Sequence, residues 1–341
     1  MPEASEDVLF VAEVSGNHLG SLSRALQIVD AAAGVGVSAI KFQTYTAETM
    51  TLDLESFVVS EDHELWGKRK LYDLYEEAHT PWEWHAELFA RCRELGVIPF
   101  SSPFDSTAVD FLESLDAPMY KIASLETGDH TLIRQVAETG KPLIVSTGAT
   151  TWEEIEELVE VVRKTGNQDL TLLVCTSSYP ALPRDAHLMR IKTIRDNFDV
   201  KVGVSDHTLG LGVSVAAIAL GATVVEKHIT LRRSDGGADA AFSLEPEEFA
   251  VLVREGRDAH SALGNADWSM QNSEKESRRL RRSLYVVADV KAGEFVTPEN
   301  LRSIRPGAGA PGKLYDFFLG KKFASDVSKG TPMDQTLLDP N

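Results

Sequence analysis

Short apolar and β-branched runs alternate along this sequence with longer segments in which apolar residues recur at helical spacing. Leu22, Leu26 and Val29, for example, are spaced so that they share one face of a helix. Segments 152–164 and 246–263 show the same amphipathic pattern. We predict strands in the eight apolar runs at residues 8–14, 39–43, 97–101, 119–124, 143–147, 170–176, 202–206 and 222–229.

The regular alternation of strand and helix predicts a parallel sheet. Eight such units in residues 1–268 favour an α/β fold of the closed (β/α)8, or TIM barrel, type over a doubly wound open sheet. In such a barrel, the loops at the carboxyl ends of the strands carry the active site. The pattern therefore indicates where functional side chains lie before any of them is identified.

Three regions depart from this alternation. Residues 44–80 are too long for an ordinary connection, and aromatic side chains such as Tyr45 and Trp66 predict a packed excursion over the barrel mouth that shapes the substrate pocket. Residues 269–282 are interpreted as a linker, whose charged run is either a partner-contacting segment or a solvated helix. In residues 283–341, short strands between Gly and Pro turns predict a small all-β domain.

Composition and charge narrow the functional classes. Of the 341 residues, 43% are hydrophobic and 25% are charged, as in an ordinary folded protein. The formal net charge of -18 argues against a broad basic surface for nucleic acid or for an anionic membrane. Residues 271–341 contain 12 Lys and Arg against nine Asp and Glu, so the negative charge belongs to residues 1–270. An anionic ligand of the barrel must therefore meet a local cluster of positive groups.

The cysteines and the first residues bear on the cell compartment. Only Cys92 and Cys175 are present, without a C-x-x-C pair, which disfavours a disulfide framework or a structural zinc site and favours a reducing compartment. The opening sequence MPEASEDVLF has neither the basic nor the apolar region of a secretory signal. We therefore expect a cytoplasmic protein.

Polar and charged residues gather at the carboxyl ends of the predicted strands. Because a charge inside a buried strand is costly unless it is paired, they indicate either a binding site or a structural network of ion pairs. In strand order they are Glu13; Lys41 and Gln43; Ser101 and Ser102; Lys121, Ser124 and Glu126; Ser146; Thr176, Ser177 and Tyr179; Ser205 and His207; and Glu226, Lys227 and His228. We favour a binding site because Ser and Lys recur at one level on successive strands.

Two kinds of chemistry fit these strand-end residues. Lys side chains with short hydroxyl donors suit the oxygens of a phosphate group. The phosphate candidates are Lys41, Lys121, Ser124, Ser146 and Ser205. His207 and His228 end adjacent strands, so both imidazoles can face one divalent metal; Mn²⁺ is our first choice, with Mg²⁺ or Co²⁺ as alternatives. His18 is either a third ligand or a loop anchor.

The segment 232–243 follows the last predicted strand. It is too rich in turn-forming residues, such as Gly236 and Gly237, to be a helix. We interpret it as a mobile loop whose Asp239 meets sugar hydroxyls, with an ordinary surface loop as the alternative.

Six short motifs stand out by their order and spacing. They are Ala12-Glu-Val-Ser-Gly-Asn-His18, Ile40-Lys-Phe-Gln-Thr-Tyr45, Ser101-Ser-Pro-Phe104, Tyr120-Lys-Ile-Ala-Ser124, Ser205-Asp-His-Thr208 and Glu226-Lys-His228. Together they resemble the sialic acid synthase family, and segment 302–307 is similar to part of the antifreeze-like, or SAF, domain of those enzymes. Segments 71–84 and 236–243 look most like the branch of the family that makes pseudaminic acid.

The resemblance implies condensation of phosphoenolpyruvate with 2,4-diacetamido-2,4,6-trideoxy-β-L-altropyranose and water, which gives pseudaminic acid and phosphate. With another N-acetyl hexose the chain would be an N-acetylneuraminate or legionaminic acid synthase, and this alternative stays open. The resemblance also adds Ser102 and Ser177 to the phosphoenolpyruvate contacts and implies a domain-swapped homodimer. It assigns sugar contacts to Gln43, Glu126, Tyr179, Asp239 and, from the neighbouring subunit, Arg305.

The expected chemistry assigns catalytic roles. With a metal activating the aldehyde, C3 of phosphoenolpyruvate attacks it, and water adds at C2 before phosphate leaves. Glu13 is our candidate base or proton relay, and Glu126 and Glu226 join the two histidines in the catalytic set. Two rival hypotheses remain: a Schiff-base aldolase that uses Lys121 or Lys227, and a non-catalytic carbohydrate-binding or ice-binding protein built on the C-terminal domain.

Overall fold

The computed structural model describes residues 8–61 and 65–340. The chain divides into two compact units, Met1–Gly264 and Asn265–Asn341, which are described here one at a time. Residues 1–7, on which the expectation about a secretory signal largely rests, lie outside the described residues. In the described part of the chain, every helix is too short or too polar to cross a bilayer.

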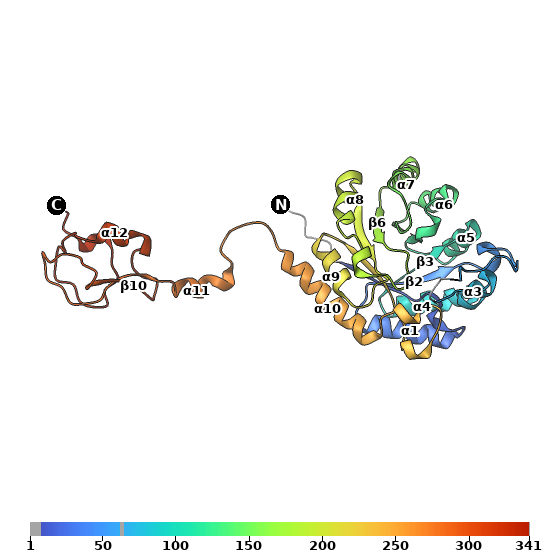
Figure 1. The fold of residues 1–341 in the computed structure, drawn as a ribbon, viewed down its shortest axis with the longest axis horizontal. Helices are drawn as coiled ribbons and strands as arrows, with labels where there is room; N and C mark the ends of the chain where they lie inside the picture. Colours follow the sequence, from blue (N-terminus) through green and yellow to red (C-terminus); the bar gives the residue numbers. More distant parts are fainter. Residues whose placement is uncertain (1–7, 62–64, 341) are drawn as a thin grey trace. The chain divides into compact units, whose positions relative to one another are not determined.

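Eight parallel strands of the first unit close into a barrel in chain order, because β1 pairs with both β2 and β8 (Figure 1). The strands are β1 (Leu9–Glu13), β2 (Ala39–Thr44), β3 (Ile98–Pro103), β4 (Tyr120–Ile122), β5 (Leu143–Ser146), β6 (Leu170–Cys175), β7 (Lys201–Ser205) and β8 (Val224–His228). Every predicted strand is confirmed, and with them the TIM barrel. The alternative of an open sheet is wrong.

Helices surround this barrel, and local capping explains where they begin (Figure 1). Before α7, the Thr151 hydroxyl accepts from the Glu154 backbone N–H, and the Glu154 carboxylate accepts from the Thr151 N–H. Both ends of α7 match the prediction, as do those of α10. The helices are α1 (Leu22–Gly34), α4 (His85–Glu94), α5 (Ser106–Ser114), α6 (His130–Glu138), α7 (Trp152–Lys164), α8 (Arg190–Phe198), α9 (Gly212–Ala219) and α10 (Pro246–Leu263).

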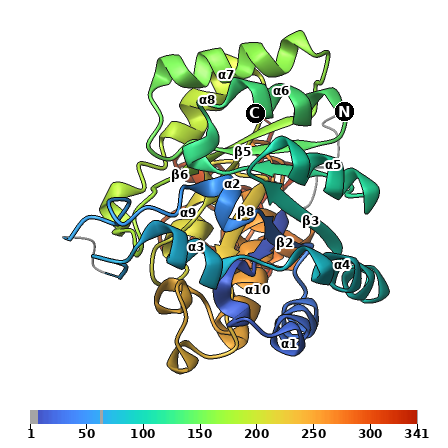
Figure 2. The same ribbon diagram turned by 90° about the vertical axis from the view of Figure 1, so that its right-hand side faces the viewer.

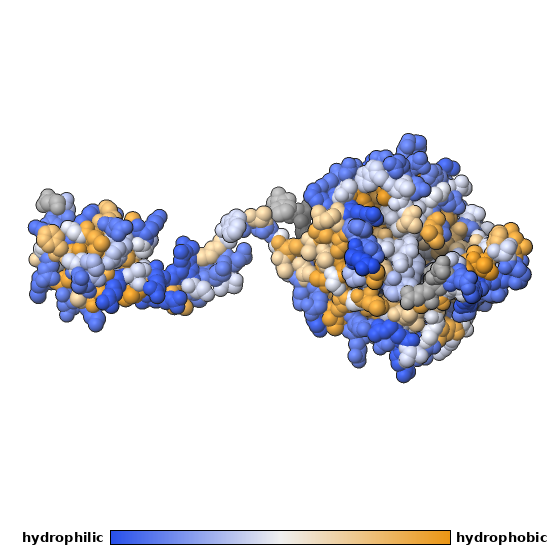
Figure 3. Space-filling model, viewed as in Figure 1, coloured by the Kyte–Doolittle hydropathy of each residue, from blue (hydrophilic) through white to orange (hydrophobic). Residues whose placement is uncertain are grey.

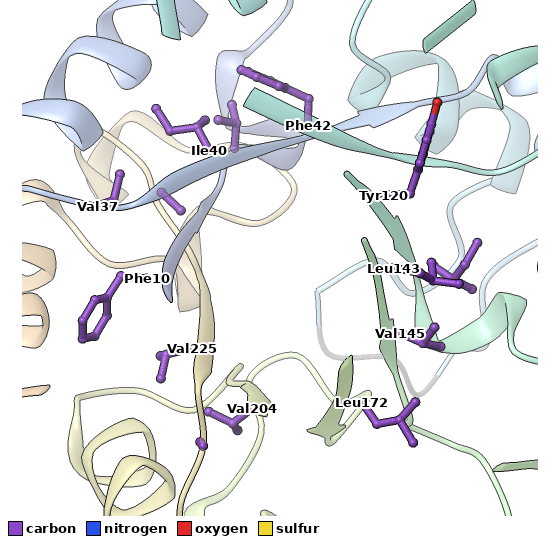
Figure 4. Packing of buried hydrophobic residues seen from close by; sticks show 14 of the residues in the cluster. Phe10, Val37, Ile40, Phe42, Tyr120, Leu143, Val145, Leu172, Val204 and Val225 are labelled. Atoms are coloured by element: carbon purple, nitrogen blue, oxygen red, sulfur yellow. The ribbon is translucent and has the colours of Figure 1, made fainter. Parts of the chain in front are cut away.

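Side chains along the strands alternate between the surrounding helices and the barrel interior. Outward-facing residues such as Phe10, Phe42 and Val225 form the large core between strands and helices (Figure 4). Inward-facing residues such as Val11 and Val224 form a smaller apolar cluster near the strand beginnings. On the face that Figure 3 shows, hydrophilic side chains cover much of α6 and α7, as expected for amphipathic helices. Toward their carboxyl ends, the strands turn polar or charged on the inside.

The excursion at residues 44–80 contains two short helices, α2 (Ala47–Met50) and α3 (Leu71–Ala78), whose positions Figure 2 shows. It is tied to other loops: the Trp66 indole N–H donates to the Ala238 carbonyl at 3.0 Å, and the Trp66 ring lies 5.6 Å from that of Tyr179. The excursion lines a cavity at the carboxyl ends of the strands. Its predicted role in shaping a pocket there is confirmed.

The second unit has its own small core and an antiparallel pair, β9 (Ser283–Val286) and β10 (Leu301–Ile304). Two similar fragments, 289–293 and 326–330, meet at an antiparallel bridge between Val290 and Val327. Each supplies an Asp that accepts a backbone N–H of the other, at Lys329 and Ala292 respectively. The two fragments, which are weakly similar in sequence, are therefore related by an approximate local twofold axis. The predicted small domain with short strands is confirmed, and short helices join it: α11 (Lys275–Arg279) before the sheet and α12 (Tyr315–Phe318) after it.

Candidate active site

Four charged side chains fill the upper interior of the barrel. Lys41 Nζ lies 2.5 Å from Glu13 Oε2 and 3.8 Å from Glu226 Oε2, and Lys121 Nζ lies 3.5 Å from Glu226 Oε1. All four are at most 4% exposed. Each lysine faces a carboxylate, as the hypothesis of a structural network of ion pairs predicts. Because all four side chains lie at the strand ends, the structure is also compatible with the hypothesis of a binding site.

The two carboxylates of this network respond differently to burial. Burial raises the pKa of Glu13 even though Lys41 opposes the shift. Burial also acts on Glu226, but Lys121 and Lys41 outweigh it and hold the pKa of that carboxyl below its usual value. Glu13 is thus the carboxylate that takes up a proton more easily.

Serine hydroxyls beside this network form a small cradle. Ser124 Oγ accepts from the Gly148 backbone N–H at 3.0 Å. A Cβ at position 148 would lie 2.2 Å from Ser177 Oγ, so only glycine fits there. Among the described residues, the buried Ser146 and Ser177 hydroxyls have no hydrogen-bond partner. Buried donors without partners are what a missing anion would leave behind.

Two further serines serve the ion pairs directly. Ser205 Oγ donates to Glu226 Oε1 at 3.0 Å, and Ser102 Oγ accepts from Lys41 Nζ at 3.4 Å. The structure therefore gathers every residue predicted for the phosphate compound at one end of the barrel.

His207 and His228 lie beside the cradle with their ring centroids 5.3 Å apart. His207 Nδ1 lies 3.1 Å from the Thr176 carbonyl, which fixes this nitrogen as the donor and leaves Nε2 free to bind a ligand. His228 Nδ1 is buried without a hydrogen-bond partner in the described part of the chain. Burial lowers the pKa of His228 well below its ordinary value, so this imidazole is neutral.

These observations fit a divalent metal held by two imidazoles. Neutral imidazole with an unpaired nitrogen is a common metal ligand. Within residues 8–61 and 65–340, no three His, Cys, Asp or Glu side chains are placed to enclose an ion. A metal here would therefore take its remaining ligands from substrate or water.

Lys227, one of the two lysines of the Schiff-base hypothesis, faces away from this interior. Its Nζ lies 3.0 Å from Asp206 Oδ2 and donates to the Thr208 carbonyl at 2.6 Å. Asp206 also accepts from the Ser214 hydroxyl of α9, which places the pair on the helix side of the strands. Since side chains alternate along β8, His228 and Lys227 must point to opposite faces. The expectation that Lys227 belongs to the strand-end site is wrong.

A cavity of about 460 Å³ lies between the strand ends and the excursion. Its polar lining includes Gln43, Glu126, Tyr179 and Asp239, all predicted as sugar contacts, together with Ser124, Ser177 and His228. Burial raises the pKa of Glu126 to about 6. The Ser15 hydroxyl donates to Asp239 Oδ2, and Asp239 is buried. The part of the loop that carries Asp239 is therefore packed into the site, and the predicted mobility of the loop stays a prediction.

Two other predicted residues lie elsewhere. His18 does not line the cavity: its ring contacts Trp84 edge-on, and its Nδ1 accepts from the Gly20 N–H, as in a loop anchor. Burial lowers the pKa of His18 to about 4. Arg305 is an exposed residue of the second unit, just before a cis-proline, and its predicted role in a neighbouring barrel stays a prediction.

Three site residues were not singled out from the sequence. Phe242 is buried against both imidazoles, at 6.0 Å from His207 and 4.9 Å from His228. Cys175 Sγ lies 3.9 Å from His207 Nδ1 and raises the pKa of that imidazole in spite of its burial. Ser15 holds Asp239 with a backbone φ of 46°, a strained value for serine. Ser15 and Cys175 both stand at strand ends, which is the signal that could have identified them.

Comparison with known proteins gives consistent findings. The NeuB family matches residues 28–267, and the SAF domain matches residues 281–337. A pseudaminic acid synthase of Campylobacter jejuni subsp. jejuni serotype O:2 is 43% identical over 330 residues, 96% of each chain. One of Helicobacter pylori is 40% identical over 324 residues, 95% of each chain. A solved N-acetylneuraminic acid synthetase of Leptospira borgpetersenii serovar Hardjo-bovis, in complex with citrate, is 32% identical with a TM-score of 0.72, covering 80% of this chain and 90% of that one.

Proposed function

The chain belongs to the NeuB family, and from this premise we propose that it condenses phosphoenolpyruvate with an N-acetylated 6-deoxy hexose and water to form pseudaminic acid and phosphate. The resemblance read from the sequence motifs is confirmed. The choice of sugar follows the two pseudaminic acid synthases, which are more similar to this chain than the neuraminic acid synthetase is. The observation that carries the proposal is that the unpaired hydroxyls of Ser146 and Ser177 and the neighbouring rings of His207 and His228 lie in one barrel mouth.

We place phosphoenolpyruvate in the cradle. The Gly148 N–H holds Ser124 Oγ in place, and the unpartnered hydroxyls of Ser146 and Ser177 can donate to phosphate. Lys41 and Lys121 supply positive charge below these hydroxyls. The cradle thus binds the anion with donors that need little rearrangement.

His207 and His228 would hold the divalent metal, with Mn²⁺ as our first choice and Mg²⁺ or Co²⁺ as alternatives. A metal bound there supplies Lewis-acid polarisation of the sugar aldehyde. Tyr179 and Phe242 pack against the His207 ring at 4.5 Å and 6.0 Å, which keeps the imidazoles in place and excludes water from them. Gln43, Glu126 and Asp239 line the cavity where the sugar hydroxyls and amides would lie.

The reaction then needs one new carbon–carbon bond and one proton acceptor. C3 of phosphoenolpyruvate bonds to the aldehyde carbon, and the electron pair of that carbonyl goes to its oxygen, which takes the proton that Glu13 carries. C2, now electron-poor, bonds to water. One water proton then goes to the Glu13 carboxylate and restores it, and the other leaves with the phosphate as the C2–O bond breaks and C2 becomes a ketone. Glu13 suits this role because burial raises its pKa and Gln43 Nε2 donates to its Oε1 at 3.0 Å, which orients the carboxylate.

The rival hypotheses fit the geometry less well. Lys227 faces the helices, and the Lys121 ammonium is buried 3.5 Å from the Glu226 carboxylate. A Schiff-base aldolase would need one of them at the substrate carbonyl. A purely carbohydrate-binding protein built on the second unit would leave the buried serines and imidazoles of the barrel without a purpose.

We also propose how the enzyme is organised. Residues 1–268 form the catalytic part, 269–282 the linker and 283–341 the SAF domain. Two chains form a domain-swapped homodimer in which Arg305 reaches the sugar in the neighbouring barrel. The enzyme works in the cytoplasm, where phosphoenolpyruvate is available.

The test is direct. The protein, freed of metal by a chelator and resupplied with Mn²⁺, is incubated with phosphoenolpyruvate and, separately, the precursor sugars of pseudaminic, legionaminic and N-acetylneuraminic acids. We expect phosphate release with the first sugar, dependence on added metal, no trapping by borohydride, and a nine-carbon keto acid identified by mass and NMR. Phosphate release with only one of the other sugars would show that the substrate is wrong, and borohydride trapping would show that the mechanism is.

A further inference from the structure

One wall of the cavity is the apolar face of α3. Leu71, Leu74, Tyr75 and Ala78 all line the cavity, and their spacing is i, i+3, i+4, i+7. On a surface helix such a stripe normally packs on the protein core. Here it borders a space of about 460 Å³ that polar groups line on other sides. The part of the stripe that is not covered by protein therefore offers an apolar surface to a ligand.

The wall is rigid. Ala78 packs so closely on the loop after β1 that a Cβ at Gly16 would lie 3.2 Å from the Ala78 Cβ. At the other side, the Tyr45 ring meets Tyr75 at 5.9 Å and Phe104 at 5.2 Å, both edge-on, and Tyr45 is 3% exposed. Met50 of α2 also belongs to the apolar lining. These packing contacts form the wall without a ligand.

The outward face of the same helix is polar. The Tyr72 hydroxyl donates to Glu48 at 2.5 Å, and Arg69 pairs with Glu77. The division of the helix is therefore sharp: residues that contact solvent carry the charges, and residues that contact the cavity carry none. Neither hydroxyl groups of a sugar nor phosphate oxygens would find a partner among Leu71, Leu74 and Met50.

We propose that this wall, with Met50 and Leu71 at its accessible part, determines specificity for a sugar that carries methyl groups away from its aldehyde. The inference rests on the proposed function. The aldehyde must lie near His228, and the rest of the six-carbon chain extends from there along the cavity. A deoxygenated C6 and the acetamido methyls bury well against the α3 stripe, whereas a C6 hydroxyl would lose its hydration without gaining a hydrogen bond.

The test compares two sugars that differ only at C6: the 6-deoxy diacetamido sugar and its 6-hydroxy analogue. We measure kcat/KM for each sugar with the purified full-length wild-type protein at saturating phosphoenolpyruvate. We expect a preference of at least ~10-fold for the 6-deoxy sugar, within the range a hydrophobic pocket achieves for one small group. In Leu71→Gln and in Met50→Gln, we expect this ratio to fall at least about fivefold, with an unchanged KM for phosphoenolpyruvate.

Leu52→Gln is the matched control, since Leu52 lies in the same excursion, is 62% exposed and does not line the cavity. Its ratio should equal that of the wild type. Both sugars are measured on one preparation, so a partly unfolded variant still reports a valid ratio. The inference is overturned if both Gln variants turn over phosphoenolpyruvate with the wild-type ratio. An absence of phosphate release with either sugar in the wild type would instead overturn the proposed function, and this inference with it.

Discussion

Lys227 and Asp206 form an ion pair whose removal should destabilise the barrel strongly. Both side chains are fully buried. In Lys227→Met, Asp206 keeps the Thr208 and Ser214 hydroxyls as donors but loses its positive partner, and the Thr208 carbonyl loses its donor. Breaking a buried pair from one side costs about 3–5 kcal/mol. We expect the lower part of that range, because the remaining hydroxyls continue to solvate the carboxylate.

The assay is urea unfolding of the whole chain, followed by tryptophan fluorescence, with the free energy of unfolding taken from the barrel transition. Lys164→Met is the control, because Lys164 pairs with Glu160 one turn away on the exposed face of α7, where such pairs are worth at most about 1 kcal/mol. The double variant Asp206→Asn/Lys227→Met should recover part of the loss, since it leaves no unpaired buried charge.

The pair also connects the two proposed metal ligands, because Asp206 precedes His207 and Lys227 precedes His228. Because the pair fixes the backbone next to both histidines, we expect Lys227→Met to bind Mn²⁺ more weakly than the wild type. A loss of less than 1 kcal/mol in stability, together with unchanged Mn²⁺ binding, would refute the reasoning.

Three other predictions concern protons. Since the pKa of Glu126 is raised to about 6, we expect kcat/KM for the sugar to decrease below about pH 6 as this hydrogen-bond acceptor is protonated. Glu126→Gln should not show this decrease. If the decrease persists in the variant, another group is responsible for it. His85 is buried with a pKa lowered to about 4, so it stabilises the fold above its ordinary pKa of about 6.5 and loses that contribution as the pH falls toward 4. Urea unfolding at pH 5 should show about 2 kcal/mol less stability from this group than at pH 7.5, a difference that His85→Gln removes and whose persistence in the variant would count against this source. Phosphoenolpyruvate binding should raise the pKa of Glu13 further, so that the protein takes up protons when it binds this ligand. Calorimetry in two buffers of different ionisation enthalpy measures this uptake, which Glu13→Gln should reduce. Equal uptake in both proteins would show that Glu13 is not the group that is protonated.

The strands of the barrel could be predicted because a strand buried on both faces is a short apolar run, and because glycines close the intervening helices. The strand-end positions of Glu13, Lys41 and His228 followed from the same runs. Because side chains alternate along a strand, Lys227 and His228 of β8 must point to opposite faces. The sequence does not show which of these two faces is turned toward the barrel axis, so it could not tell which residue lies in the site.

Other parts of the site depend on contacts between distant segments. Ser15 and Asp239 are joined by a hydrogen bond across 224 positions, and Trp66 reaches Ala238 across 172. No local pattern specifies such contacts, because each loop is compatible with many placements until the barrel has closed. For the same reason, the sequence did not indicate that Phe242 packs this glycine-rich loop among the rings of Tyr179 and His228.

The charge network inside the barrel shows how the site can be stable both with and without its anion. Two buried lysines facing a cradle of hydroxyls would repel each other and lose hydration if the carboxylates were absent. Glu13 and Glu226 remove that cost, but they also reduce the positive charge that an incoming anion meets. The conflict is eased by the difference between the carboxylates: Glu226 is held charged between two lysines, whereas burial makes Glu13 ready to accept a proton. An anion that enters the cradle therefore competes mainly with Glu13, and the proton that Glu13 takes up leaves Lys41 free to bind the substrate.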